Sequence, residues 1–115
     1  MLRGEIRVVD LDPARSGEAG KLRPAVIVSN DAANAAAAKL GRGVVTVAPV
    51  SSNVDRVYPF QVLLPAGESR LSSDSKVQAE QVRSVSVERV AEHIGFVPAE
   101  LMLEVDEALR LHLAL

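Results

Sequence analysis

The stretch GKLRPAVIVSND, residues 20 to 31, decides how the chain folds because it holds one of the few long apolar runs in the sequence. An arginine, Arg23, stands just before that run. Pro24 can open a strand but cannot donate a hydrogen bond within a ladder. The run from Ala25 to Val28 is therefore predicted to be a buried strand that starts at the proline. A residue that precedes a proline is pushed into an extended conformation. The side chain of Arg23 thus leaves the backbone in a narrow range of directions.

Length and composition indicate one globular domain spanning residues 1 to 115. A chain of 115 residues can build a core of its own, and its 48% hydrophobic and 24% charged residues exclude a disordered protein. No apolar run approaches the roughly 18 residues of a membrane-spanning helix. The first residues, MLRG, lack the apolar segment of a secretory signal. We therefore expect a cytoplasmic protein without a membrane partner.

The residues that usually hold metals are scarce. The sequence contains no cysteine, which excludes disulfides, thiolate catalysis and cysteine-ligated zinc. Its histidines, His93 and His112, are far apart and form no HxxxH or HExxH pattern. A metal site would have to depend on scattered carboxylates, so we expect neither a metal nor another cofactor.

The charges are distributed unevenly along the chain, although the formal net charge is only −2. Residues 1 to 83 hold eleven Lys or Arg against nine Asp or Glu, whereas residues 84 to 115 hold two against six. A polyanion should therefore meet the first two thirds of the chain. The acidic remainder should be a structural face or a surface for a partner.

Hydrophobic patterning and turn residues predict short strands, two short helical pieces and a closing helix. Strands are expected at residues 4–11, 24–29, 43–52, 60–64 and 74–85 and in the segment HIGFV, with a short turn or helix at 86–91. Asn30 or Asp31 should cap a short helix that ends near Lys39, with Gly41 as its left-handed stop. These elements predict a small antiparallel barrel with helical caps.

Two of these segments carry more detailed expectations. In the strand 74–85, Val77 and Ala79 should share one face while Gln78 and Glu80 share the other. The closing helix should take Pro98 as its first residue and bury a stripe formed by Leu101, Val105 and Leu109.

Three polar groups interrupt the apolar strands or stand at their ends. They are Arg23, the pair Ser51 and Ser52, and a set around VQAEQVRS formed by Gln78, Glu80, Gln81 and Arg83. A guanidinium offers a planar fork of donors that fits a phosphate, and a serine hydroxyl can add one more hydrogen bond. If Arg23 and Ser51 meet in space, they form a phosphate clamp. The serine lacks a GxSxG elbow, which excludes a Ser-His-Asp nucleophile site.

Ordinary structural roles remain open for the same residues. Taken alone, Arg23 before a strand could be a surface ion-pair partner, and Ser51 with Ser52 could simply end a strand in a turn. Glu80, Gln81 and Arg83 could form a polar strand face with cross-strand partners.

The order of several motifs resembles the MazF/PemK (Kid) family of toxin endoribonucleases, also called mRNA interferases. The motifs are RGEI, VDLDP, GKLRPAVIVSND, APVSSN, SDSKVQAEQVRSV and VDEALRLHLAL, which together cover nearly the whole chain. The family's fold is a mainly β, SH3-like antiparallel barrel with short helices and a C-terminal α-helix, shared with the gyrase-poisoning CcdB toxins. The resemblance therefore implies the same class of fold as the patterning.

The resemblance also implies an activity and the residues that perform it. The family cleaves single-stranded RNA at a short sequence without a metal, by attack of the substrate's own 2′-hydroxyl on the adjacent phosphate. Arg23 matches the family's catalytic arginine, and Ser51 matches a position usually held by threonine. The residues expected along the RNA groove are Glu18, Ser52, Glu80, Gln81 and Arg83. The family's partners imply a homodimer that is silenced by a small acidic antitoxin of the MazE type.

A toxin that binds DNA gyrase without enzymatic activity, as CcdB does, is the competing interpretation. Gyrase poisons of the related fold act through the C-terminal end of the chain, where an aromatic residue is expected. The last residues here, LHLAL, contain no aromatic side chain, which favours the nuclease.

Overall fold

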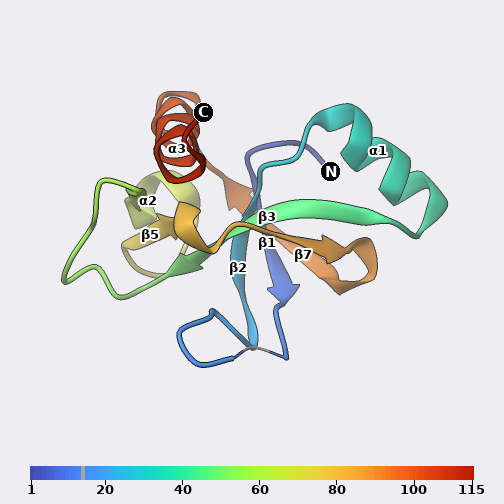
Figure 1. Ribbon diagram of the computed structural model, residues 1–115, viewed down its shortest axis with the longest axis horizontal. Helices are drawn as coiled ribbons and strands as arrows, with labels where there is room; N and C mark the ends of the chain where they lie inside the picture. The colour runs from blue at the N-terminus through green and yellow to red at the C-terminus, as the bar shows by residue number, and fades with distance from the viewer. Residues whose placement is uncertain (14) are drawn as a thin grey trace.

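The computed structural model describes residues 1–13 and 15–115 and consists of one antiparallel sheet with helices at its ends (Figure 1). The strands are β1 (Glu5–Asp10), β2 (Leu22–Ile27), β3 (Val44–Ser51), β4 (Gln61–Leu64), β5 (Ser75–Gln78), β6 (Arg83–Ser86) and β7 (Val90–Phe96). The helices are α1 (Asp31–Leu40), α2 (Ala66–Ser69) and α3 (Ala99–Leu113), with two short 3₁₀ helices, η1 (Ala79–Gln81) and η2 (Val87–Arg89).

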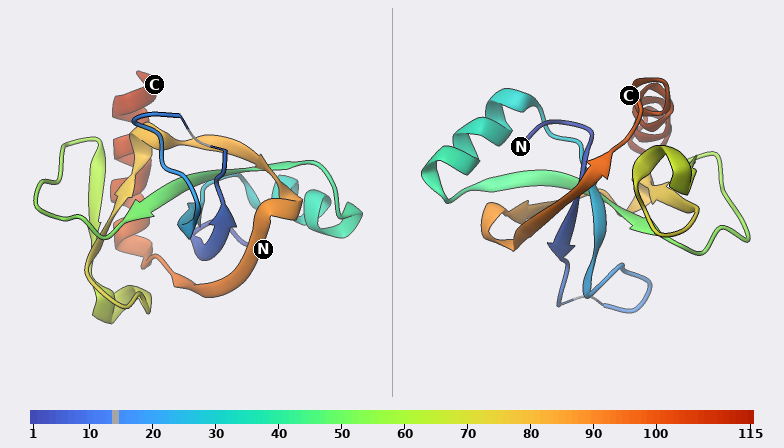
Figure 2. Two further views of the ribbon diagram at one scale, coloured as in Figure 1. Left: turned by 90° about the horizontal axis from the view of Figure 1, so that it is seen from below. Right: turned by 180° about the vertical axis from the view of Figure 1, so that it is seen from behind.

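The sheet follows the order β4-β5-β3-β2-β1-β7, and β6 pairs with β3 outside this path. Helices α1 and α3 lie at opposite ends of the sheet, with the long strand β3 running between them (Figures 1 and 2). In the described residues no ladder joins β4 to β7, so the sheet is open. The prediction of a mainly β, antiparallel fold with a C-terminal helix is confirmed. None of the described helices is long and apolar enough to span a bilayer.

Strands β2 and β3 bury both of their faces, and this produces two hydrophobic cores. Val26 and Ala48 face one cluster, which also holds Val105 of α3, whereas Ile27 and Val47 face the other. Because side chains alternate along a strand, a strand that is covered on both faces has a continuous apolar sequence. This is why the runs AVIV and VVTVAPV show no polar alternation.

The predicted start of β2 is wrong by two residues. The strand begins at Leu22, and Pro24 pairs with Val8 of β1 inside the ladder. On its other side β2 pairs with β3 only from Ala25 onward. Pro24 therefore lies where β2 has a single strand neighbour, which a residue without an N–H tolerates.

The predicted strand 74–85 is two strands separated by η1. β5 pairs with Val50 and Ser51 at the end of β3, whereas β6 pairs with residues 44–47 at its beginning. The turn at η1 carries the chain from one of these positions to the other. Val77 and Ala79 are both buried as expected, but Ala79 and Glu80 belong to η1 and not to a strand face.

The ends of the helices follow their capping residues. The Asn30 side chain accepts a hydrogen bond from the Ala33 N–H, and Gly41 ends α1 at a φ of 67°, as predicted. Pro98, by contrast, is the N-cap of α3 with a ψ of 148°, not its first helical residue. In α3 Val105 is fully buried, and Leu101 and Leu109 pack against the same core while remaining half-buried.

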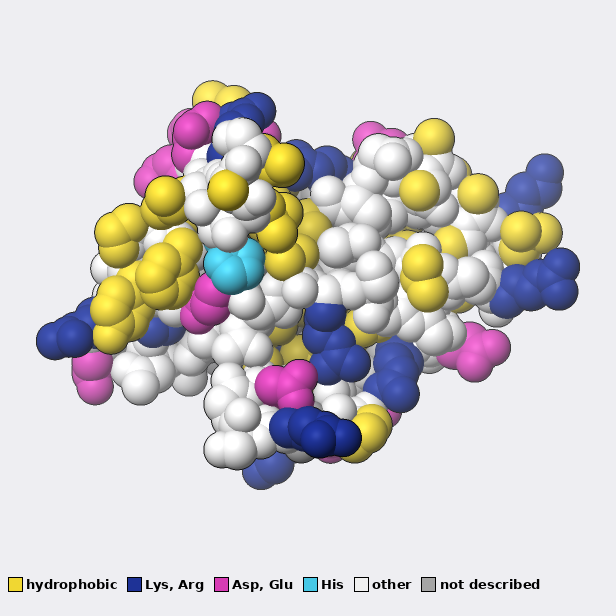
Figure 3. All heavy atoms as spheres, viewed as in Figure 1, with side chains coloured by type: hydrophobic (Ala, Val, Ile, Leu, Met, Phe, Trp, Pro, Cys, Tyr) yellow, Lys and Arg dark blue, Asp and Glu magenta, His cyan; other side chains and the backbone are white. Residues whose placement is uncertain are grey.

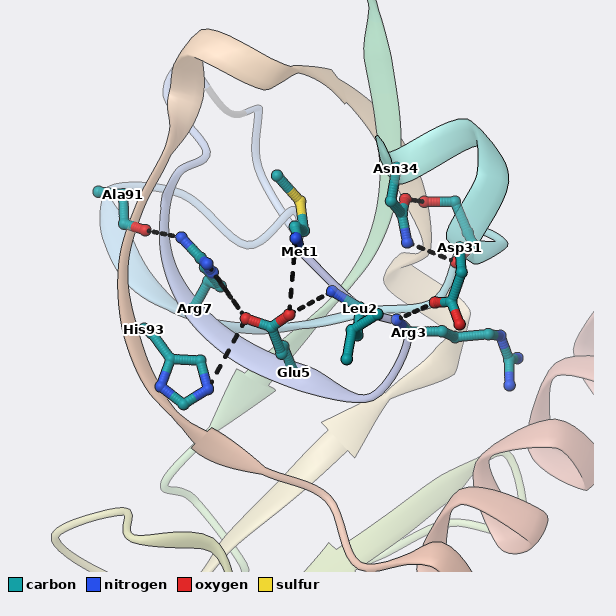
Figure 4. A network of polar contacts seen from close by, with 10 residues as sticks. Met1, Leu2, Arg3, Glu5, Arg7, Asp31, Asn34, Ala91 and His93 are labelled. Atoms are coloured by element: carbon teal, nitrogen blue, oxygen red, sulfur yellow. Dashed lines mark hydrogen bonds and ion pairs between the residues drawn. The ribbon is translucent and has the colours of Figure 1, made fainter. Parts of the chain in front are cut away.

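Glu5 is buried at the start of β1, where donors surround its carboxylate (Figure 4). The carboxylate lies 3.1 Å from Arg7 Nη2, 3.7 Å from His93 Nε2 and 3.9 Å from the amino group of Met1, and it accepts the Leu2 N–H. Burial alone raises the pKa of Glu5. The hydrogen bonds from Leu2 and Arg7, together with the charges of Arg7 and the N-terminus, outweigh burial, so the pKa lies below its ordinary 4.5.

Acid should therefore destabilise the fold partly through Glu5. A carboxyl whose pKa is lowered by folding contributes stability above its unfolded pKa, and this contribution is lost as the pH falls through the folded pKa. We expect the free energy of unfolding, measured with urea, to fall more steeply below about pH 5 in the wild type than in Glu5→Gln. Glu100→Gln, at an exposed carboxylate of α3, should keep the wild-type slope. Equal slopes in the wild type and Glu5→Gln would contradict this expectation.

Candidate functional site

Arg23 and Ser51 lie just beyond the end of the ladder that joins β2 to β3. The ladder ends with Ala25 paired to Pro49, and Arg23 and Ser51 are each two residues past this last pair. Both residues line one surface hollow of about 360 Å³. The other lining residues are Lys21, Leu22, Pro24, Val50, Ser52, Leu71, Ser72, Ser73 and Ser75. The structure thus brings together the two side chains that the sequence suggested for a phosphate.

The ladder between β2 and β3 stops short of this hollow. Beyond it, each strand keeps a single partner strand among the described residues: Val50 and Ser51 of β3 pair with β5, and Arg23 of β2 pairs with Val9 of β1. In the sheet β3 lies between β5 and β2. The hollow is built on strand ends, which hold functional side chains more rigidly than loops do.

The guanidinium of Arg23 is fixed at one nitrogen only. Its Nε donates to the Gly20 carbonyl at 3.0 Å, and the side chain is half-buried. Within residues 1–13 and 15–115, Arg23 forms no ion pair, and its two terminal nitrogens donate to no protein group. These terminal nitrogens retain the paired donors that suit the oxygens of an anion.

The Ser51 hydroxyl is held as an acceptor. Its Oγ accepts the Asn53 N–H at 3.2 Å, a contact that orients the oxygen at the end of β3. The hydroxyl proton is left to donate, because a serine oxygen can accept and donate at the same time. Ser52 follows as an exposed residue that lines the same hollow.

The other predicted site residues gather around a second hollow of about 380 Å³. It is lined by Glu18, Ala19, Glu80, Gln81, Val82 and Arg83. Residues 18 and 19 of the β1–β2 loop line this hollow, and residues 21 to 23 line the first. The loop is therefore a wall shared by both hollows, and Figure 3 shows Lys and Arg side chains gathered near it at the lower middle of that face.

Two side chains of the second hollow hold the backbone of this loop. The Gln81 Oε1 accepts the Ala19 N–H at 3.1 Å, and its Nε2 donates to the Gly17 carbonyl at 3.0 Å. Arg83 Nη1 donates to the Leu11 carbonyl at 3.0 Å. Both side chains thus shape the loop in the free protein, and their contact with RNA stays a prediction.

The two predicted carboxylates differ in their surroundings. Glu18 is exposed and accepts the Arg15 N–H at 2.7 Å within the loop. Glu80 Oε2 accepts from Gln61 Nε2 at 2.8 Å, while its Oε1 is buried without a partner among the described residues. Neither contact tests a role in RNA binding.

Sequence reasoning missed four polar residues that line the Arg23 hollow, namely Lys21, Ser72, Ser73 and Ser75. Lys21 adds a second cation and has a φ of 64°, with its N–H donating to Asp12 Oδ1 at 2.7 Å. Because Lys21 lies outside β2 and is not extended, the alternation of strand side chains gives no signal for it. Ser72 and Ser73 follow α2, a helix that the sequence pattern did not predict. No three Asp, Glu or His side chains of the described residues gather as a metal site would require.

Comparisons with known proteins agree with the resemblance seen in the motifs. A family model described as the PemK-like, MazF-like toxin of type II toxin-antitoxin systems matches residues 2–113. The endoribonuclease MazF9 of Mycobacterium tuberculosis is 60% identical over 115 residues, which cover 100% of this chain and 98% of the relative.

Solved structures of Deinococcus radiodurans show the same fold. Its MazF is 29% identical with a TM-score of 0.80, covering 100% of this chain and 97% of that one. The matching chain of a MazE-MazF structure from the same organism is 28% identical in sequence, with a TM-score of 0.75. The match covers 100% of this chain and 96% of that one. The chain therefore belongs to the PemK-like, MazF-like toxin family of type II toxin-antitoxin systems.

Proposed function

We propose that this chain is a toxin endoribonuclease that cleaves single-stranded RNA, with Arg23 and Ser51 acting on the scissile phosphate. The observation that carries the proposal is that the free end of a guanidinium and a serine hydroxyl line one hollow at adjacent strand ends. The relative that is 60% identical bears the name endoribonuclease. No comparable support exists for the gyrase-binding alternative, because that relative is named for RNA cleavage.

The reaction uses the RNA's own hydroxyl as nucleophile. The 2′-oxygen forms a bond to the neighbouring phosphorus and loses its proton, the bond from phosphorus to the 5′-oxygen breaks, and that oxygen gains a proton. The products are a 2′,3′-cyclic phosphate and a free 5′-hydroxyl. As the new bond forms, negative charge grows on the non-bridging oxygens, and donors that are already in place stabilise it more than they stabilise the ground state. We assign this stabilisation to Arg23 and Ser51.

The residues around the shared loop are proposed to hold the rest of the RNA. Lys21 and Ser52 lie beside the phosphate hollow, and Glu18, Glu80 and Arg83 surround the neighbouring one. A cation near the backbone contributes affinity without reading sequence, whereas carboxylates and amides can accept from base edges. The second hollow is therefore the proposed place of base selection.

We further propose that the toxin acts in the cytoplasm as a homodimer and is silenced by a small acidic antitoxin. The support is the MazE-MazF structure of Deinococcus radiodurans, whose toxin chain is 28% identical to this one. An acidic segment that covered the β1–β2 loop would meet Lys21 and Arg23 and would exclude RNA from both hollows.

The test is cleavage of a long RNA by the purified protein in the presence of EDTA. We expect discrete fragments with 5′-hydroxyl ends. A matched RNA with a single 2′-deoxy nucleotide on the 5′ side of a mapped cleavage point should resist cleavage at that point only, because the nucleophile is absent. Cleavage that continues at the deoxy position would contradict the mechanism. Intact RNA together with inhibited gyrase would overturn the proposed function.

A further inference from the structure

The side chains of Gln81 and Arg23 are attached to neighbouring residues of the β1–β2 loop. Gln81 binds the N–H of Ala19 at 3.1 Å and the carbonyl of Gly17 at 3.0 Å. Arg23 Nε binds the carbonyl of Gly20 at 3.0 Å. The two attachments are one residue apart along the backbone. A displacement of the loop at Ala19 would therefore move the carbonyl that orients the guanidinium.

Gln81 holds the part of the loop next to Gly20. Apart from the Arg23 bond to Gly20, the other hydrogen bonds that described residues make to the loop backbone lie at its ends, at Leu11, Asp12 and Lys21, or join Arg15 to Glu18 within it. Residues 15 to 18 are exposed, and Gly17 adopts a φ of 85°, a conformation that glycine reaches without steric cost. The burial of Ala19 in the second core fixes one point, and the two hydrogen bonds of Gln81 fix the backbone on either side of residue 18. A loop with glycines and exposed backbone would otherwise sample many conformations.

We propose that Gln81 is a positioning residue, which holds the β1–β2 loop so that Gly20 orients the guanidinium of Arg23 toward the phosphate hollow. The inference rests on the proposed role of Arg23. Gln81 lines the second hollow and not the one that contains Arg23 and Ser51, so it acts on the reaction through the loop. Small displacements of a group that stabilises a transition state reduce rates strongly, while they affect substrate binding less.

The first experiment compares Gln81→Ala with the wild type on one RNA of known cleavage site. We expect kcat to fall about tenfold and KM to change less than about twofold, because orientation and not affinity is lost. Gln78→Ala is the matched control. Gln78 lies three residues earlier at the end of β5, lines neither hollow and should keep the wild-type kcat. A raised KM with an unchanged kcat would mean that Gln81 contacts the RNA directly and would overturn the proposal.

A double-mutant cycle then tests whether Gln81 acts through Arg23. Lysine carries all its donors on one nitrogen and lacks the Nε–H that binds the Gly20 carbonyl in arginine. In an Arg23→Lys background the loop therefore no longer orients a planar fork of donors. Adding Gln81→Ala to Arg23→Lys should cost less than about twofold in single-turnover rate. If the full tenfold loss appears again, the effect is independent of Arg23 and the positioning role is refuted. The role of Arg23 itself fails if Arg23→Ala cleaves at the wild-type rate, so the two failures are distinguishable.

A conservative variant addresses the possibility that Gln81→Ala folds poorly. In Gln81→Glu the ionised carboxylate can accept the Ala19 N–H, but its second oxygen faces the Gly17 carbonyl and repels it. Protonation restores a donor at that position, so the variant then resembles the amide. Its kcat relative to the wild type at the same pH should rise as the pH is lowered from about 7 to 4, because a glutamate ordinarily gains its proton at a pH of about 4.3. A ratio that stays constant across this range would contradict the hydrogen-bonded positioning of the loop.

Discussion

Replacing Arg23 with alanine is expected to lower RNA cleavage by about a hundredfold or more while the protein stays folded. Arg23 lines the same hollow as Ser51, and the terminal nitrogens of its guanidinium donate to no described residue. Removing it withdraws the donors that would meet the charge on the phosphate as the 2′-oxygen attacks. The measurement is the single-turnover rate on one RNA, with enzyme in excess so that a large loss can be quantified.

Folding should change little, because the Arg23 side chain makes one hydrogen bond, to a carbonyl of a surface loop. Circular dichroism and the thermal midpoint should therefore match those of the wild type. Arg42→Ala is the matched control, since Arg42 is an exposed arginine just beyond α1 and lines neither hollow. Its loss should leave cleavage within about twofold of the wild type. Cleavage near the wild-type rate in folded Arg23→Ala protein would remove Arg23 from the mechanism.

The fold was predictable where its signals are local. Asn30 and Gly41 bracket α1 because one side chain caps the first N–H groups and the other residue reaches a left-handed φ. The apolar runs around Ile27 and Val47 identified the central strands because both of their faces are covered. Signals of this kind lie within a few residues of the element that they determine.

The break at η1 was not predictable in the same way. Whether residues 74–85 form one strand or two depends on β3, which receives β5 at Ser51 and β6 at Val44. This pairing is set by tertiary contacts between distant segments, and the alternation of Val77 with Ala79 is the same in either case. Local patterning therefore marked the buried residues correctly and still gave the wrong element.

The candidate site shows the same limit. Arg23, Ser51 and Gln81 were selected as polar residues at strand ends, but their relative placement depends on where β3 changes partner. The sequence also does not show that the side-chain amide of Gln81 forms hydrogen bonds with the loop backbone. The sequence predicts that this side chain contacts RNA, whereas in the folded chain it holds the backbone of the loop beside the site.

Gly95→Ala is expected to be among the most destabilising single substitutions in the sheet, because β7 passes directly over the end of α2. A Cβ at Gly95 would lie 2.2 Å from the Ser69 carbonyl oxygen and 3.2 Å from the Arg70 Cβ. The first of these atoms is backbone, and it is anchored: Ser69 is fully buried and its Oγ donates to the Pro65 carbonyl at 2.9 Å. The clash must therefore separate β7 from α2, at a cost of about 3 kcal/mol.

For a domain of this size, such a loss should lower the thermal midpoint by roughly 10 °C. Gly67→Ala is the matched control, because Gly67 lies in the same short helix and a Cβ there meets nothing within 4 Å. Alanine favours a helix over glycine by about 1 kcal/mol, so Gly67→Ala should be neutral or slightly stabilising. Calorimetry on the two variants distinguishes a steric clash from a general effect of adding a methyl group. Equal midpoints would show that α2 moves away from β7 freely, and the packing of β7 against α2 would then not hold this end of the sheet in place.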